Sequence, residues 1–268
     1  MEAMIEKIKG FLPENHPWKD KIIWYDTIES TNTEAKRLAA NYAPHGTTVI
    51  ADHQTGGRGR LGRSFYSPKG AGIYLSVILR PMCPPEQLMH LTCAAAVYLC
   101  DAVEHAVGLR PGIKWTNDLV YEKRKIAGIL TELSVNQSSA LTNYVILGIG
   151  INCNQAITDF PEEIQSFAGS VAMFAPEVTR EKLAASIIQS IFQMDQALLN
   201  EKDQILRRYG NDCITVGKEI CLLRGDRRQY GTATQINSDG SLCVLFNDGN
   251  RENVQSGEVS IRGMYGYI

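Results

Sequence analysis

Residues 54–63, with the sequence QTGGRGRLGR, restrict the choice of fold more than any other segment of this chain. Residues 57–62 match the pattern G-x-G-x-x-G, which in a dinucleotide-binding fold opens a helix and precedes an acidic residue by about 20 positions. Here Ser67-Pro68 and then an apolar stretch typical of a strand follow the pattern, and residues 53–85 contain no Asp or Glu. The sequence therefore excludes a dinucleotide-binding βαβ unit and places a glycine-rich loop between two strands.

The same segment, which with the next two residues we call the arginine–glycine loop (residues 54–65), contains Arg58, Arg60 and Arg63. Glycines allow the backbone to approach a ligand closely, and guanidinium groups match the oxygens of carboxylates and phosphates. No Gly-Lys-Ser/Thr ends the pattern, so it is not a P-loop. The net charge of −2 provides no overall basic field, so a site for an anion must be local. A solvated basic turn remains the alternative interpretation.

Composition limits the class of protein. The length of 268 residues suggests one or two domains. The seven cysteines include no C-x-x-C pair, which argues against a disulfide framework or a zinc site and suits a reducing compartment. The first residues lack the apolar core of a signal peptide, and no apolar run reaches the roughly 20 residues of a bilayer span. We expect a soluble cytoplasmic protein whose own side chains bind no metal ion.

Hydrophobic periodicity predicts alternating strands and helices. The capping box formed by Thr31 and Glu34 predicts a helix from about Asn32 to Tyr42. Further helical patterns cover residues 88–107 and 179–209. Residues 143–151 are predicted to form a strand paired with residues 125–133, and their apolar run suits a central position in the sheet. The other predicted strands are residues 22–25, 47–52, 73–80, 113–115 and 125–133.

The pattern changes at residues 210–212. From residue 214 onward there are only short strand patterns separated by glycines, and Asp239-Gly240 is a hairpin signal. We therefore predict two domains, residues 1–211 and residues 212–268, and the second is a small β-barrel.

Two further segments are candidates for a site. Lys114 lies where a predicted strand ends, and Lys125 begins another. Gly148 and Gly150 share one face of an apolar strand, because alternate residues of a strand point the same way. A flat ligand could lie against that face. The alternatives are a surface lysine and a bulge or close helix packing at the glycines.

Five ordered motifs resemble those of biotin protein ligases: S-T-N (30–32), Q-T-G-G-R-G-R-L-G-R (54–63), K-W-T-N-D (114–118), R-K-I-A-G-I-L (124–130) and G-I-G-I-N (148–152). Residues 257–262, G-E-V-S-I-R, are similar to the end of that family's small domain. The resemblance implies an α+β fold. This fold is a mixed β-sheet flanked by helices, the biotin/lipoate ligase core of class II aminoacyl-tRNA synthetase type, with a C-terminal SH3-like β-barrel. Lipoate and octanoate ligases share the core without the arginine–glycine loop and remain an alternative.

The resemblance implies an ATP-dependent ligase that forms biotinyl-5′-AMP from biotin and ATP and then transfers biotin to a lysine of a biotin carboxyl carrier domain. Mg²⁺ would be carried by the phosphates. No DNA or membrane partner is expected, and a homodimer is left open. The family's repressors carry an N-terminal DNA-binding domain, for which the residues before 22 are too few. The alternative from a different class is a nucleic-acid-binding module that uses the arginine–glycine loop.

The resemblance also assigns site residues. Lys114 and Arg60 would be the catalytic residues. Biotin would be bound by Ser30, Thr31, Asn32, Gln54, Arg58, Gly59, Arg60, Lys114, Gly128, Gly148 and Gly150. The nucleotide would be bound by Arg58, Arg60, Arg63, Phe65, Asn117, Lys125 and Asn152. The chain departs from the family pattern at Thr116, where proline is usual, and at Phe65, where tryptophan is common.

Overall fold

The first domain is built on a mixed seven-stranded β-sheet in the order β1-β2-β3-β7-β6-β5-β4. The computed structural model describes residues 2–255 and 260–263. Only β1 and β2 pair in parallel; the other neighbouring strands are antiparallel. The strands are β1 (Ile22–Tyr25), β2 (Thr48–Ala51), β3 (Gly72–Leu79), β4 (Gly112–Lys114), β5 (Asp118–Tyr121), β6 (Arg124–Val135) and β7 (Thr142–Asn152). Strand β7 is central, as its apolar run predicts.

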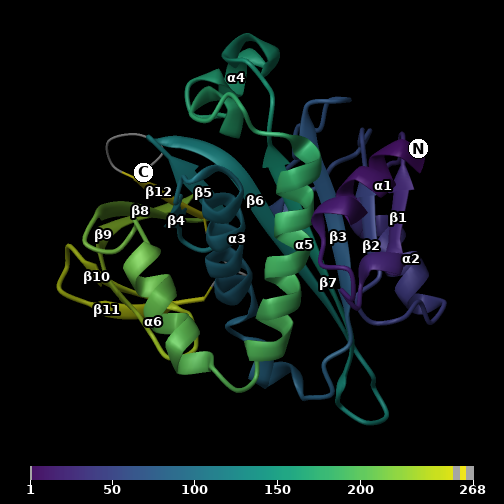
Figure 1. The fold of residues 1–268 in the computed structure, drawn as a ribbon. Helices are drawn as coiled ribbons and strands as arrows, with labels where there is room; N and C mark the ends of the chain where they lie inside the picture. Colours follow the sequence, from purple (N-terminus) through teal and green to yellow (C-terminus); the bar gives the residue numbers. More distant parts are fainter. Residues whose placement is uncertain (1, 256–259, 264–268) are drawn as a thin grey trace.

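Helices cover both faces of this sheet (Figure 1). The helices of this domain are α1 (Glu2–Phe11), α2 (Thr31–Ala40), α3 (Leu91–Val107), α5 (Arg180–Ala197) and α6 (Lys202–Asp212). The short α4 (Glu162–Gln165) projects beyond the end of the sheet (Figure 1). On β3, Val77 belongs to the core that contains α3 and α5, whereas Ile78 packs with Ala35 and Ala39 of α2. Because neighbouring strand residues point to opposite faces, α2 lies on one face of the sheet, and α3 and α5 lie on the other.

The predicted strands are confirmed, two helical predictions need correction, and not every helix was predicted. Ser30, not Thr31, caps α2: its hydroxyl accepts from the amide of Thr33 at 3.5 Å. The helical pattern of residues 179–209 is divided between α5 and α6, because both helices pack against α3 and the chain must turn between them. Helix α1 was not predicted; it packs mainly against α5.

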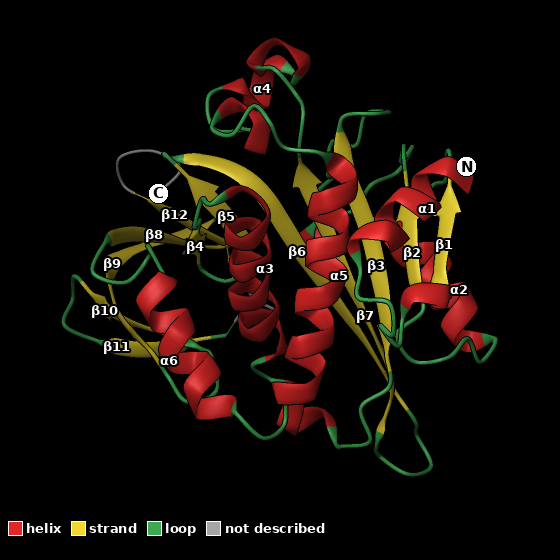
Figure 2. Cartoon of the chain, viewed as in Figure 1, coloured by secondary structure: helices red, strands yellow, loops and turns green. Residues whose placement is uncertain are grey.

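The second domain is a five-stranded antiparallel sheet in the order β11-β10-β9-β8-β12 (Figure 2). Its strands are β8 (Glu219–Arg224), β9 (Arg227–Ile236), β10 (Leu242–Phe246), β11 (Arg251–Val254) and β12 (Ser260–Gly263). The predicted turn at Asp239-Gly240 joins β9 to β10, and Gly240 has a φ of 85°. Of the motif at residues 257–262, residues 257–259 lie outside the described residues. The boundary between residues 211 and 212 stays a proposal.

The described chain contains no helix that is both long and apolar enough to cross a bilayer.

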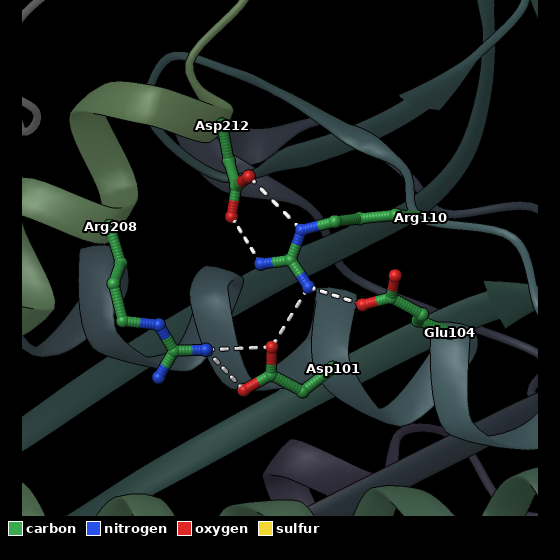
Figure 3. Close-up of polar contacts among 5 residues, drawn as sticks. All are labelled: Asp101, Glu104, Arg110, Arg208 and Asp212. Atoms are coloured by element: carbon green, nitrogen blue, oxygen red, sulfur yellow. Dashed lines mark hydrogen bonds and ion pairs between the residues drawn. The ribbon is translucent and has the colours of Figure 1, made fainter.

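A cluster of ion pairs joins α3 and α6 at the point where the chain leaves for the second domain (Figure 3). Arg110 donates to both carboxylate oxygens of Asp212, the last residue of α6, at 3.1 and 2.6 Å. Its third nitrogen reaches Asp101 and Glu104 of α3 at 3.0 and 2.6 Å. Arg208 of α6 also pairs with Asp101, at 2.5 Å. These contacts raise the pKa of Arg110 and fix the end of α6 against α3.

We expect Arg110→Met to lower the free energy of unfolding by about 1–3 kcal/mol, because it leaves the partly buried carboxylate of Asp212 without its cation. Denaturant unfolding measures the change. Lys9→Met, which removes the ion pairs of Lys9 with the exposed carboxylates of Glu6 and Asp20, is the matched control and should change stability little. An equal loss in both variants would show that the cluster contributes nothing beyond a surface pair.

Candidate active site

A cavity of about 130 Å³ lies over the face of the sheet that α2 partly covers. Residues of β6 and β7 form its floor, the first residues of α2 form one wall, and the arginine–glycine loop forms another. Except for Asn152, every residue that the sequence singles out lines this cavity: Ser30, Thr31, Asn32, Gln54, Arg58, Gly59, Arg60, Arg63, Phe65, Lys114, Asn117, Lys125, Gly128, Gly148 and Gly150. Segments distant in sequence are therefore brought together as expected.

One end of the cavity is lined by neutral polar side chains. The backbone amide and the hydroxyl of Thr31 both reach the Oε1 atom of Gln54, at 2.8 and 3.1 Å. The Nε2 atom of Gln54 then donates to Ser67 at 2.9 Å. Asn32 receives a hydrogen bond from Ser76 at 2.6 Å. Because Ser30 caps α2, the start of that helix presents these groups directly to the cavity.

The two glycines of β7 are each covered by a neighbouring side chain. A Cβ atom at Gly148 would collide with the side chain of Asn32, and one at Gly150 would lie 2.6 Å from the ring of Phe65. The glycines thus leave room for Asn32 and Phe65 to lie against the sheet.

The second half of the arginine–glycine loop folds as a narrow hairpin. The amide of Phe65 donates to the carbonyl of Gly57 at 2.9 Å, and the amide of Gly59 donates to the carbonyl of Arg63 at 2.6 Å. A short turn of helix covers Arg60–Gly62, and inside it Leu61 adopts a left-handed φ of 56°. Arg58 lies 3.7 Å from Glu29, and both side chains are substantially exposed. The loop is thus held by its own backbone.

Arg60 turns inward from this hairpin. Its Nη1 atom donates to the hydroxyl of Thr116 at 2.8 Å and to the Oδ1 atom of Asn117 at 2.9 Å. Its Nη2 atom is buried and has no hydrogen-bond partner among the described residues. Burial lowers the pKa of Arg60, although Asp118 opposes this. Arginine remains charged even so, and a bound anion would supply the missing acceptor.

Two lysines add positive charge at this end. Lys114 is buried at the end of β4, with 5% of its surface exposed. Lys125 pairs with Asp118 at 2.7 Å. Three cations with one nearby carboxylate favour an anionic ligand.

Asn152 lies apart from the cavity. Its Nδ2 atom donates to the carbonyl of Gly169 at 2.9 Å, in a buried position. Sequence spacing alone could not reveal this contact, because Gly169 belongs to a later segment of the chain.

The segment that contacts Arg60 is itself held from several directions. The Tyr209 hydroxyl of α6 donates to the carbonyl of Thr116 at 3.1 Å. The amide of Trp115 donates to Thr215 at 2.9 Å, and its indole nitrogen donates to the carbonyl of Gly240 in the second domain at 3.2 Å. The peptide bond between Trp115 and Thr116 is cis. The turn beside the cavity is therefore bonded to both domains.

Comparison with known proteins gives the family. Residues 24–152 match the model of the biotin/lipoate A/B protein ligase family. The chain is 35% identical over 233 residues to the bifunctional ligase/repressor BirA of Bacillus subtilis. The matched region covers 85% of this chain and 70% of that protein. It is 32% identical over 224 residues to the biotin–[acetyl-CoA-carboxylase] ligase of Mycobacterium tuberculosis, with 80% and 79% covered. The chain belongs to the biotin protein ligase family. It is a ligase.

A solved structure agrees with this assignment. The biotin protein ligase from Aquifex aeolicus in complex with biotin and ATP matches with a TM-score of 0.76 and 28% identity, covering 90% of this chain and 98% of that one. The predicted fold class, a mixed sheet flanked by helices with a small C-terminal β-domain, is confirmed.

Several polar residues around the cavity of this ligase were not predicted, among them Asp118, Ser76 and Glu132. Asp118 lines the cavity beside Lys125, and it directly follows Asn117 in the K-W-T-N-D motif, which could have indicated it. Ser76 of β3 donates a hydrogen bond to the Oδ1 atom of Asn32 at 2.6 Å, and Glu132 of β6 accepts one from its Nδ2 atom at 2.8 Å. No spacing rule connects these two residues with the start of α2, because the contacts arise only when the sheet forms.

We expect Gly150→Ala to displace Phe65 and loosen the hairpin, because the new Cβ would be too close to the ring. If the folded hairpin loses about 1 kcal/mol of stability relative to an opened one, the population of opened hairpin rises roughly fivefold. Tryptic cleavage after Arg58, Arg60 and Arg63 should accelerate by about the same factor. Gly210→Ala is the control, since nothing lies within 4 Å of a Cβ at that position of α6. Mass spectrometry identifies the cleaved bonds, and equal rates in the two variants would contradict the packing role of Gly150.

Proposed function

We propose that this ligase joins biotin to a lysine of a biotin carboxyl carrier domain in two steps that consume ATP. The observation that supports this most strongly is that one cavity connects a neutral polar end, formed by Thr31, Asn32 and Gln54, with a cationic end, formed by Arg60 and the two lysines. Biotin has the same division, with a neutral ureido ring at one end and a carboxylate at the other. The related Aquifex aeolicus ligase is named as a complex with biotin and ATP.

At the neutral end, amide and hydroxyl groups provide both donors and acceptors, which a ureido ring requires. The proposed biotin-binding residues are Ser30, Thr31, Asn32, Gln54, Arg58, Gly59, Arg60, Lys114, Gly128, Gly148 and Gly150.

In the first step an oxygen of the biotin carboxylate attacks the α-phosphorus of ATP, and the bond to pyrophosphate breaks. Two anions must approach, and negative charge is spread over the phosphoryl oxygens in the transition state. Arg60 and Lys114 are the proposed catalytic residues because fixed positive charge in a buried site stabilises that state. The proposed nucleotide contacts are Arg58, Arg60, Arg63, Phe65, Asn117 and Lys125. In the second step the carrier's lysine amine attacks the acyl carbon of biotinyl-5′-AMP, and AMP leaves.

Mg²⁺ carried by the phosphates fits the donor set of the cavity. Mg²⁺ is usually bound by one or two carboxylates together with phosphate oxygens and water. Asp118 is the one carboxylate among the described residues that line the cavity. In a departure from the sequence expectation that no side chain binds a metal ion, it would hold the Mg²⁺ that neutralises phosphate charge. Among the described residues no group of three His, Cys, Asp or Glu side chains could bind a metal by itself.

We propose a cytoplasmic location as well. All seven cysteines are free and buried, which suits a reducing compartment.

The proposed function predicts that the chain, ATP, Mg²⁺, biotin and a carrier domain lacking biotin yield pyrophosphate, AMP and a biotinylated lysine. Mass spectrometry of the carrier detects the modification. Titration calorimetry with biotin and with lipoate decides between the two substrates, and biotin should bind more tightly. Absence of turnover by folded protein with several carriers, or preference for lipoate, would contradict the proposal.

Lys114→Ala and Arg60→Ala should each slow adenylate formation by about 100-fold or more, because removal of one such group typically costs about 3 kcal/mol of transition-state stabilisation. Pyrophosphate release measures the rate, and circular dichroism checks folding. Lys7→Ala is the control, since Lys7 is exposed and pairs with Glu181 outside the cavity lining. A folded Lys114→Ala variant with the wild-type rate would remove this residue from the catalytic set.

A further inference from the structure

Glu132 of β6 lies at the neutral end of the cavity, behind the residues that line it. Its Oε2 atom accepts a hydrogen bond from Nδ2 of Asn32 at 2.8 Å. Its other oxygen forms an ion pair with Lys36, one turn further along α2. Asn32 is buried, with 5% of its surface exposed. The carboxylate of Glu132 is thus held between the partly exposed Lys36 and the buried amide of Asn32.

This contact fixes the direction of the Asn32 amide. A carboxylate can accept hydrogen bonds and cannot donate them. Asn32 must therefore turn its NH₂ group toward Glu132 and its carbonyl oxygen toward Ser76. The Ser76 hydroxyl lies 2.6 Å from that oxygen and must be the donor, because a carbonyl oxygen only accepts.

The orientation of the Asn32 amide also determines the direction of hydrogen bonding between Ser76 and Thr31. The Ser76 oxygen also lies 2.8 Å from the hydroxyl oxygen of Thr31, but Ser76 has a single proton. Because that proton goes to Asn32, it does not occupy a lone pair of Thr31. The Thr31 hydroxyl therefore donates its own proton, either to Ser76 or to the Oε1 atom of Gln54, 3.1 Å away. The Thr31 oxygen consequently faces the cavity as an acceptor.

A ureido ring carries two N–H donors beside its carbonyl, so it needs acceptors on the pocket wall. We propose that Glu132 is a positioning residue for biotin: held by Lys36, it orders the hydrogen bonds through Asn32 and Ser76 so that Thr31 accepts a ring N–H. This inference rests on the proposed function, because it takes the neutral end as the site of the ureido ring. Glu132 itself touches no substrate.

The variant Glu132→Gln tests the order of the hydrogen bonds. Lys36 attracts the glutamine oxygen, which leaves the glutamine NH₂ group facing Asn32 and reverses the Asn32 amide. Ser76 then donates to Thr31 and occupies one of the two lone pairs of its oxygen, which weakens that oxygen as an acceptor for a ring N–H. The KM for biotin should rise about tenfold, which corresponds to about 1.4 kcal/mol, whereas the KM for ATP and kcat should stay within about twofold, since uniform binding of one substrate is lost.

Glu34→Gln is the matched control. Glu34 lies on the same helix and pairs with Arg37 and with the hydroxyl of Tyr25, away from the cavity lining. The Glu34→Gln variant also removes one negative charge from an ion pair on α2. Because the carboxylate of Glu34 is bonded to Arg37 and Tyr25 instead of Asn32, the KM for biotin should not change.

The double variant Lys36→Glu with Glu132→Lys separates positioning from stability. It restores an ion pair of opposite direction, so the melting temperature should return toward that of the wild type. A lysine can only donate, however, and it would turn the carbonyl of Asn32 toward position 132. The KM for biotin should therefore stay about tenfold above that of the wild type.

The outcomes are distinct. If the wild-type chain forms no biotinyl-5′-AMP, the proposed function itself fails. If the wild type is active and the charge-swapped variant regains its KM for biotin, Glu132 serves only as a structural ion-pair partner and the inference is overturned. An unchanged KM in Glu132→Gln overturns it equally, and this variant decides alone if the double variant does not fold.

Discussion

The cavity depends on two glycines, which leave the backbone of the central strand uncovered by side chains of its own. Strand β7 has neighbours on both sides, and it carries Gly148 and Gly150 on the face toward α2. Side chains there would exclude Asn32, which comes from α2, and Phe65, which comes from the arginine–glycine loop. A residue with a Cβ at either position would push one wall of the cavity away from the floor. The two glycines therefore determine how closely a helix start and a loop can meet over the same strand.

The second constraint is the burial of positive charge. Burial of a cation without compensation is costly, and Arg60 has only the neutral oxygens of Thr116 and Asn117 as direct partners for one of its nitrogens. Those partners stay in place because Tyr209 and the second domain's Gly240 bond the same segment. The buried Nη2 atom of Arg60 has no hydrogen-bond partner among the described residues and remains available to an anion. The second domain thus contributes to the position of a group in the first.

The strands could be predicted from sequence because each has a buried face and a period of two. The five ordered motifs contain nearly all the residues that line the cavity. What could not be predicted depends on contacts made only in the folded chain. Asn152 bonds to Gly169 instead of facing the cavity, and Glu132 reaches Asn32 across 100 positions. The turn between α5 and α6 contains neither glycine nor proline, so local sequence does not show it. Capping by Ser30 and by Thr31 has similar local signals, and the structure uses the former.

The arginine–glycine loop matches the dinucleotide-binding pattern G-x-G-x-x-G, but its glycines have a different structural role. In a dinucleotide-binding loop the backbone N–H groups at a helix N-terminus bind the phosphates. Here the amides of Gly59, Arg63 and Phe65 are already bonded to carbonyls of the same hairpin. A Cβ at Gly57 would also collide with the carbonyl of Phe65, so this glycine serves the closure of the hairpin. Because these amides are used internally, recognition of an anion falls to side chains, and this accounts for arginines in a loop whose glycine spacing would otherwise suggest backbone recognition.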